Sequence, residues 1–201
     1  MSELQRWEDR FSASEYVFGR EPNHFLASCA SLLPKSGRAL AIADGEGRNG
    51  VWLATRGLDV HSVDFSPKAQ AKARALAKDV GVDVQFELGD AHAWAYPKAA
   101  YDVVADIFTQ FSDPQQRALK WQNLRQSLKP GGLLIVAGYT PKQLEHGTGG
   151  PRVLSHLYTR KMLEEAFHGM SDLHIVEEEL EMREGAGHKG MSAVIGLTAR
   201  A

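Results

Sequence analysis

The sequence has few of the features that mark secreted or membrane-spanning chains. Its 201 residues include one cysteine, Cys29, so no internal disulfide can form and a reducing compartment is favoured. No apolar run approaches the roughly 20 residues that a membrane-spanning helix needs. The chain begins Met-Ser-Glu-Leu-Gln-Arg, which is unlike a signal peptide. We therefore expect a cytoplasmic protein with no membrane partner.

A basic surface is also missing. Lys and Arg number 23 against 25 Asp and Glu, for a formal net charge of −2, and no run of basic residues stands out. Nucleic-acid-binding proteins carry basic patches, so we expect no nucleic acid partner. The histidines form no pair at metal-ligand spacing with other ligands, so no metal is expected. The sequence predicts a small-molecule partner and carries no pattern that predicts an oligomeric state.

Glycines concentrate at the point where an apolar run ends. Residues 40–43 are apolar, Asp-Gly-Glu-Gly-Arg-Asn-Gly follows at 44–50, and a helical pattern begins at Val51. Glycine lacks Cβ, so the backbone can take positive φ and approach a ligand closely, and the N-terminus of the following helix offers free N–H groups. This pattern predicts a strand, a tight turn and a helix that bind a nucleotide-like cofactor.

Strand and helix patterns alternate along most of the chain, which predicts a parallel sheet with helices on both faces. The predicted strands are 40–43, 58–63, 82–88, 101–108 and 133–137, and the predicted helices are 51–56, 66–80, 113–128 and 159–167. Two further strand patterns, Leu173–Leu180 and Met191–Thr198, are joined by residues 181–190, a connection too short for a crossover helix, so they are expected to pair antiparallel. We expect one domain over 1–201, with an α/β core over 38–201.

The first 33 residues form a helical segment before this core, broken around Ser12 to Pro22. Two interpretations are open for it. The segment is either a helix packed on the core, or a lid that closes over the cofactor. In the second case Tyr16 or Phe18 would cover the cofactor and Arg20 would clamp a carboxylate.

Three features bear on the cofactor. Residues 45–50 match G-x-G-x-x-G literally, and Asp64 ends the second predicted strand, where an acid can hold ribose hydroxyls, as in dinucleotide-binding proteins. Asp90 follows the third strand, where a carboxylate can accept from an adenine amino group. Together with the closing hairpin, Asp90 favours S-adenosylmethionine over a dinucleotide.

The chain resembles class I S-adenosylmethionine-dependent methyltransferases, and within them the tellurite-resistance and thiopurine methyltransferase-like branch. The segments that carry the resemblance are Trp7–Phe11, Glu15–Asn23, Gly45–Asn49, Val63–Ser66, Leu128–Gly132 and Glu184–Gly190. The resemblance implies a three-layer Rossmann-like fold, with a mostly parallel seven-stranded sheet and a C-terminal antiparallel hairpin. The chain departs from the family where Ala41 and Ala43 replace a common acid and a common glycine.

The same resemblance implies which residues bind the cofactor. Asp64 would hold the ribose hydroxyls, Phe65 would pack on adenine, Asp90 and Ala91 would read the adenine edge, and Gly45 would pass the methionine and ribose. The full expected set is Tyr16, Arg20, Asp44, Gly45, Glu46, Gly47, Asn49, Asp64, Phe65, Ser66, Asp90, Ala91 and Ile107.

The expected reaction is methyl transfer to a small-molecule acceptor. A thiol, selenium or tellurium nucleophile fits best, since it needs little help from a base. His188 is the candidate catalytic residue, because it lies in a glycine-rich connection and the resemblance places a histidine there. The candidate acceptor-facing residues are Phe108, Gln110, Phe111 and Tyr139.

Two alternatives stay open at this point. One is a module that binds S-adenosylmethionine without turnover, which is suggested by Ala41, Ala43 and the lack of an obvious general base. The other is an NAD-binding oxidoreductase domain, which is suggested by the literal glycine motif.

Overall fold

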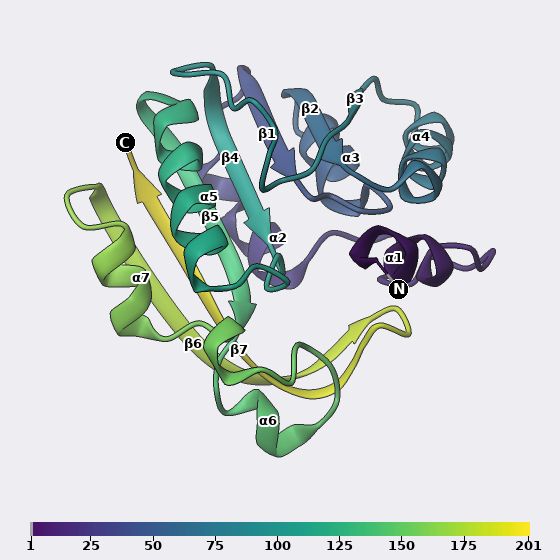
Figure 1. Ribbon diagram of the computed structural model, residues 1–201. Coiled ribbons are helices and arrows are strands. Elements are labelled where there is room, and N and C mark those ends of the chain that lie inside the picture. The colour runs from purple at the N-terminus through teal and green to yellow at the C-terminus, as the bar shows by residue number, and fades with distance from the viewer. Residues whose placement is uncertain (1) are drawn as a thin grey trace.

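A seven-stranded sheet runs through the computed structural model, which describes residues 2–201 (Figure 1). The strand order is β3-β2-β1-β4-β5-β7-β6. The strands are β1 (Arg38–Ile42), β2 (Asp59–Asp64), β3 (Gln85–Leu88), β4 (Tyr101–Ile107), β5 (Leu128–Tyr139), β6 (Ser171–Glu184) and β7 (His188–Arg200). Strands β1 to β5 pair in parallel, and β7 pairs antiparallel with both β5 and β6. The predicted Rossmann-like fold class is confirmed.

Helices connect the strands and cover both faces of the sheet (Figure 1). The helices are α1 (Glu3–Arg10), α2 (His24–Ser28), α3 (Arg48–Thr55), α4 (Pro67–Val80), α5 (Pro114–Ser127), α6 (Gln143–His146) and α7 (Arg160–Ala166), with short 3-10 turns at Cys29–Leu32 and Leu154–His156. The predicted helix starts at Ser66 and Asp113 are confirmed. Ser66 caps α4 with its hydroxyl, and Asp113 and Gln116 form a capping box on α5.

Two apolar clusters hold these layers together, one on each face of the sheet. Trp121 of α5 and Phe167 of α7 belong to one cluster, whereas Leu26 of α2 and Leu53 of α3 belong to the other. Strand β5 contributes alternate residues to both clusters, because successive side chains of a strand point to opposite faces. This explains the continuous apolar run of the predicted fifth strand, which is buried on both sides.

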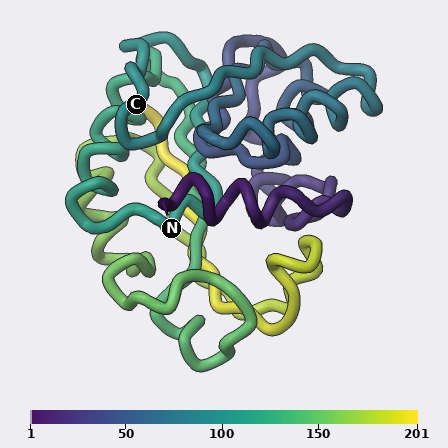
Figure 2. The backbone as a smooth tube through the Cα atoms, turned by 45° about the vertical axis from the view of Figure 1, so that its right-hand side comes forward, coloured from purple at the N-terminus to yellow at the C-terminus, as the bar shows by residue number. Residues whose placement is uncertain are grey.

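The C-terminal hairpin is longer than the sequence pattern predicts. Residues 181–190, predicted as a connection, are mostly paired strand, with Met182 opposite Gly190 and Glu184 opposite His188. Only residues 185–187 form the turn. The hairpin therefore reaches past the body of the sheet toward the N-terminal segment, as two views show (Figures 1 and 2). The expectation that His188 lies in a loop is wrong, because His188 is the first residue of β7.

Residues 2–201 contain neither a membrane-spanning helix nor a cluster of metal ligands. No helix combines the length and the apolar composition that a bilayer crossing requires. No group of three or more His, Cys, Asp or Glu side chains is arranged to hold a metal ion.

A buried ion pair lies below the carboxyl end of β4. Lys120 of α5 donates to Asp106 Oδ1 at 3.1 Å, Trp121 Nε1 donates to Asp106 Oδ2 at 2.9 Å, and both charged side chains are fully buried. Lys120 also donates to the Thr109 hydroxyl, in the turn that follows β4. Burial lowers the pKa of Lys120, while the charge of Asp106 opposes that effect. The pair thus fixes the start of the turn that carries Phe108.

Replacing Lys120 with Met is expected to lower the free energy of unfolding by about 3–5 kcal/mol, because the Asp106 carboxylate stays buried without its cation. Urea denaturation measures this loss. The matched control is Lys161→Met, since the Lys161 side chain is 83% exposed and its loss should change stability by less than about 0.5 kcal/mol. Adding Asp106→Asn to Lys120→Met should recover part of the loss. If Lys120→Met and Lys161→Met lowered the free energy of unfolding by the same amount, this role of the ion pair would be contradicted.

Candidate active site

The carboxyl ends of the parallel strands bring the predicted site residues to one edge of the sheet. The glycine turn follows β1, Asp64 ends β2, Asp90 follows β3 and Phe108 follows β4. Because these four strands are neighbours in the order β3-β2-β1-β4, their ends lie side by side. Open parallel sheets bind ligands at this edge.

The glycine turn has left-handed backbone at three positions. Gly45 and Gly47 have φ of +58° and +86°, and Ala43 has φ of +48°. Left-handed backbone costs a residue with a side chain about 1–2 kcal/mol. The turn therefore keeps the conformation for which the resembling family commonly uses glycine, even though alanine stands at position 43.

The three glycines of the G-x-G-x-x-G motif have different structural roles. A Cβ on Gly47 would lie 2.5 Å from the Cβ of Ala73, so Gly47 allows α3 and α4 to pack closely. A Cβ on Gly50 would lie 2.4 Å from an oxygen of Asp44, so Gly50 leaves room for that carboxylate. A Cβ on Gly45 would meet only the ring of Phe11, at 3.6 Å. Gly45 is thus the glycine whose neighbourhood leaves space for a ligand.

Asp44 is held inside the turn. Its carboxylate accepts from Ser62 Oγ at 2.8 Å and from Gly50 N at 3.2 Å. Burial raises the pKa of Asp44 to about 7, and these hydrogen bonds only partly oppose the rise. Asp44 also lines a hollow of about 170 Å³ at the ends of β1 and β4, whose lining residues are Ala41, Ile42, Ala43, Asp44, Asn49, Ala105 and Ile107.

Asp64 ends β2 and Asp90 follows β3, so both lie at the same edge of the sheet as this hollow. Asp64 accepts from Gly45 N and from Ser66 N, both at 2.8 Å, and burial raises its pKa to about 6. The Asp90 side chain is 53% exposed and accepts from His92 N at 2.9 Å. Each carboxylate is oriented by backbone N–H groups, so both are fixed in place before any ligand arrives.

The remaining members of the expected set lie close by. Ala91 is buried, Phe65 is half-buried between Asp64 and the start of α4, and Ile107 is the last residue of β4. The Ser66 hydroxyl is occupied, because it caps α4 and donates to Glu8 of α1.

The side chains of Tyr16 and Arg20 bond to α4. The Tyr16 hydroxyl donates to Lys72 O at 3.0 Å, and Arg20 pairs with Asp79 at 2.8 Å. Both partners belong to α4, so the segment that carries Tyr16 and Arg20 runs along that helix. The sequence shows no sign of this docking, because it depends on residues more than fifty positions away.

The side chains of the glycine turn hold this N-terminal segment. Glu46 accepts from Val17 N at 2.8 Å, and Asn49 Oδ1 accepts from Asn23 N at 2.9 Å. The Glu46 carboxylate is buried and also pairs with Lys72, so in this structure it bonds to protein groups, and its expected cofactor role stays a prediction. Asn49 holds the N-terminal segment and also lines the hollow at the ends of β1 and β4.

A buried ion pair between Arg48 and Glu184 joins the turn to the C-terminal hairpin. The two side chains are 2.7 Å apart and 6% and 11% exposed. Arg48 also donates to Phe18 O, and Glu184 accepts from His24 N at 2.8 Å. Burial by itself would raise the pKa of Glu184, but the His188 ring, the Arg48 charge and the His24 N–H lower it to about 2. The sequence predictions missed both partners of this pair.

His188 lies in an aromatic cluster that also contains Phe18, Phe108 and Tyr139. Its ring centroid is 4.5 Å from Phe18, 4.6 Å from Phe108 and 5.6 Å from Tyr139. Within residues 2–201, the buried His188 Nδ1 and Tyr139 hydroxyl have no hydrogen-bond partner, and Glu184 lies 3.6 Å from Nδ1. Burial lowers the pKa of His188, so the ring is neutral at pH 7.

Of the four candidate acceptor-facing residues, two lie beside His188 and two make other contacts. Phe108 and Tyr139 face His188, with the Phe108 backbone at a φ of +55°. Gln110 instead braces β5, since its amide bonds the backbone N and O of Tyr139. Phe111 packs against the ring of His92.

Comparisons with known proteins agree with this architecture. Residues 39–132 match a family model described as a methyltransferase domain. Demethylmenaquinone methyltransferase of Thermus thermophilus is 37% identical over 108 residues, which are 52% of this chain and 48% of that protein. The chain thus spans about half the length of the curated relatives it matches.

Solved structures show the same fold at low sequence identity. A protein studied for the conversion of a disulfide bond into a thioacetal group during echinomycin biosynthesis has a TM-score of 0.79 and 16% identity, with 99% of this chain and 93% of that chain covered. The N-methyltransferase NodS of Bradyrhizobium japonicum, crystallised with S-adenosyl-L-homocysteine, has a TM-score of 0.72 and 15% identity, covering 98% and 97%. Residues 39–132 thus resemble a methyltransferase domain, and the whole chain has the Rossmann-like fold of these solved structures.

Replacing Glu184 with Gln should lower the free energy of unfolding by about 3–5 kcal/mol, because the Arg48 guanidinium stays buried without its counter-charge. Thermal and urea unfolding measure the change. Glu181→Gln serves as the control, since the Glu181 side chain is 60% exposed and its loss should change stability by less than about 0.5 kcal/mol. If Glu184→Gln were as stable as this control, the proposed importance of the pair would be refuted.

The raised pKa of Asp44 predicts how stability depends on pH. The folded protein holds the Asp44 proton up to about pH 7, whereas an unfolded chain releases it near the ordinary value of 3.8. The folded state binds more protons in this window, so stability falls as pH rises from 4 to 7, by up to about 1.4 kcal/mol per pH unit.

Asp44→Asn removes this titration and should make the decline between pH 4 and 7 shallower. Urea midpoints measured at several pH values test it, with the exposed Asp83→Asn as a control that should leave the slope unchanged. An unaltered slope in Asp44→Asn would show that Asp44 releases its proton at the same pH in both states.

Proposed function

We propose that this chain transfers a methyl group from S-adenosylmethionine to a small-molecule acceptor. The observation that carries the proposal is the set of carboxylates at one edge of the sheet: Asp44 precedes Gly45, Asp64 accepts from Gly45 N, and Asp90 follows β3 at the same edge. Among the three glycines of the turn motif, Gly45 leaves the most room for a ligand. A methyltransferase domain over residues 39–132 supports the same activity.

The residues at the sheet edge fit the parts of this cofactor. Each oxygen of Asp64 accepts one backbone N–H and keeps acceptor capacity for a ribose hydroxyl. Asp90 is accessible to an adenine amino group, and Phe65 can pack on the ring. The hollow beside Gly45 would take the methionine part, between Asp44 and Ile107.

The charge of the site favours this cofactor over NAD. Asp44 and Asp64 lie at the glycine turn, and Arg48, the guanidinium of the turn, is neutralised by Glu184. Burial raises the pKa of both aspartates, and a cation nearby would favour their ionised forms. S-adenosylmethionine brings a sulfonium and an ammonium, whereas the pyrophosphate of a dinucleotide would meet like charge. A dehydrogenase role is therefore disfavoured.

The sulfonium supplies the reactive methyl group, and the protein contributes alignment and exclusion of water. His188 is neutral, so the unprotonated nitrogen of its ring can accept a proton from an acceptor that enters the aromatic cluster. We assign the acceptor to the thiol, selenium or tellurium class, since a soft nucleophile requires no stronger base than a neutral imidazole.

A second candidate is a domain that binds S-adenosylmethionine without turnover. The observation that favours it is that the buried His188 ring packs against Phe18. Arg48 holds Phe18 in place by donating a hydrogen bond to its carbonyl oxygen. Incubation with S-adenosylmethionine and small thiols, followed by a search for S-adenosylhomocysteine, separates the two candidates. Tight cofactor binding without any product would support the second.

Asp64→Asn is expected to weaken the binding of S-adenosylhomocysteine at least tenfold, because hydrogen bonds to a charged group contribute about 1.5–3 kcal/mol. The amide oxygen can still accept from Gly45 N or Ser66 N, which limits the effect on folding. Isothermal titration calorimetry measures the affinity, with Asp83→Asn as the control. Equal affinity of Asp64→Asn and the native protein would remove Asp64 from the site, and tighter binding of NAD would overturn the proposed function.

A further inference from the structure

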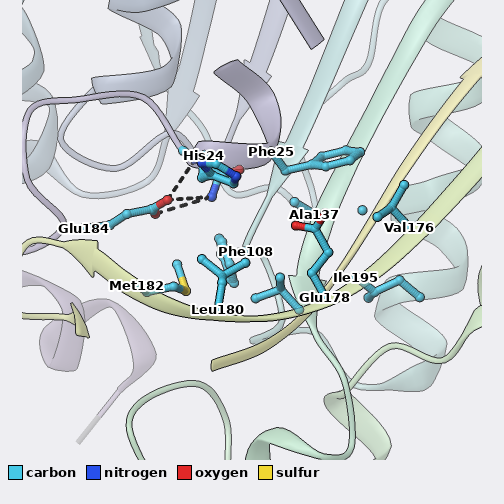
Figure 3. A pocket seen from close by; sticks show the side chains of 13 residues that line it. His24, Phe25, Phe108, Ala137, Val176, Glu178, Leu180, Met182, Glu184 and Ile195 are labelled. Carbon is cyan, nitrogen blue, oxygen red and sulfur yellow. Dashed lines mark hydrogen bonds between the residues drawn. The ribbon is translucent and has the colours of Figure 1, made fainter. Parts of the chain in front are cut away.

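A second hollow, about 350 Å³ when the solvent space at its mouth is included, lies between α2 and the C-terminal hairpin (Figure 3). Alternate residues of β6 line one side of it, and Phe25 of α2 lies opposite, with Phe108 and Ala137 at its inner end. The β6 residues are Val176, Glu178, Leu180, Met182 and Glu184. The hollow thus follows the extended hairpin that the sequence pattern did not predict.

Gly196 of β7 shapes this hollow. A Cβ on Gly196 would lie 2.3 Å from the ring of Phe25, so only glycine lets this ring rest on β7. Phe25 then forms an aromatic wall against the sheet, opposite the β6 side chains. At that side the hollow is lined by Leu180, which is half-buried, and by Met182, which is buried.

The two hollows are immediate neighbours. Ile107 lines the cofactor hollow, Ala137 lines the second one, and the two residues are register partners on β4 and β5. Adjacent strands lie roughly 4.8 Å apart. On the opposite side, Asn49 of the cofactor hollow bonds to Asn23 of the second one at 2.9 Å. Phe108, whose backbone φ is +55°, stands at this boundary.

The lining of the second hollow selects a hydrocarbon group. Its inner surface is made by aromatic and aliphatic side chains, and its carboxylates are Glu178, which is exposed, and Glu184, which is neutralised by Arg48. No Lys or Arg side chain lines it. An oxyanion such as selenite or tellurite would meet carboxylates there, whereas an alkyl or aryl group would be removed from water.

We propose that this hollow binds the hydrocarbon part of the methyl acceptor, and that the acceptor is an alkyl or aryl thiol whose sulfur points past Phe108 toward the cofactor hollow. This inference rests on the proposed function for its reaction, but the binding step is independent of turnover. In the reaction the sulfur forms a bond to the methyl carbon, the bond from that carbon to the sulfonium breaks, and the thiol proton passes to His188 or to water.

The first test is binding of hexanethiol and propanethiol, followed by NMR of protein labelled with ¹³C at the methionine methyl groups. Hexanethiol should shift the Met182 signal and leave Met162 and Met170 unchanged, because those two pack against the apolar cluster on the opposite face. Each buried CH₂ contributes about fourfold in affinity, so hexanethiol should bind roughly 60-fold more tightly than propanethiol. Met182→Leu assigns the signal.

The second test narrows the hollow. Leu180→Trp should reduce hexanethiol affinity at least tenfold and abolish the dependence on chain length, whereas Leu154→Trp, at a 61% exposed position, should bind as the native protein does. Thermal unfolding checks that both variants fold. The same variants are then assayed for S-adenosylhomocysteine formation with each thiol, where kcat/KM should follow the affinities.

The outcomes separate this inference from the proposed function. If S-adenosylhomocysteine binds but hexanethiol leaves Met182 unshifted, or if selenite or tellurite is methylated in preference to hexanethiol, the assignment of the hollow is overturned while the methyltransferase proposal stands. If hexanethiol shifts Met182 but no S-adenosylmethionine is bound, the hollow is a thiol site and the proposed function fails.

Discussion

The buried ion pair between Arg48 and Glu184 is the constraint on which the site depends. Burying two charges is unfavourable unless they meet each other and their remaining hydrogen bonds are made, and both conditions hold here. The pair joins the helix after the glycine turn to the tip of the hairpin, and Arg48 also holds the backbone at Phe18. Three segments that are far apart in the sequence are thereby fixed against one another.

In this arrangement the residues of the glycine turn have two separate roles. The side chains of Glu46, Arg48 and Asn49 hold the N-terminal segment, while Asp44 and Asn49 line the hollow at the ends of β1 and β4. Phe108 stands where this hollow meets the apolar one beside β6. A strained backbone at such a place is typical of functional sites, because the surrounding contacts determine it. Donor and acceptor would therefore meet at Phe108.

Much of the fold could be predicted from the sequence because the signals are local. The alternation of strand and helix patterns, the caps at Ser66 and Asp113 and the short connection between the last two strands each depend on residues within a few positions of one another. The strand-end positions of Asp64 and Asp90 follow from the same alternation, since parallel strands end at one edge. The sequence therefore predicts that these two carboxylates lie at one edge of the sheet.

The sequence by itself therefore determined the layered fold and the sheet edge where the strand-end carboxylates lie. Only the tertiary structure decided which distant residues the side chains of the N-terminal segment and of the hairpin contact. The side chains of Tyr16 and Arg20 bond to residues of α4, residues 181–184 and 188–190 continue the hairpin as paired strands, and His188 is buried among aromatic rings. These outcomes arise from pairings between residues tens to more than a hundred positions apart. Such pairings are set by packing and by the need to neutralise buried charge, and no local pattern encodes them.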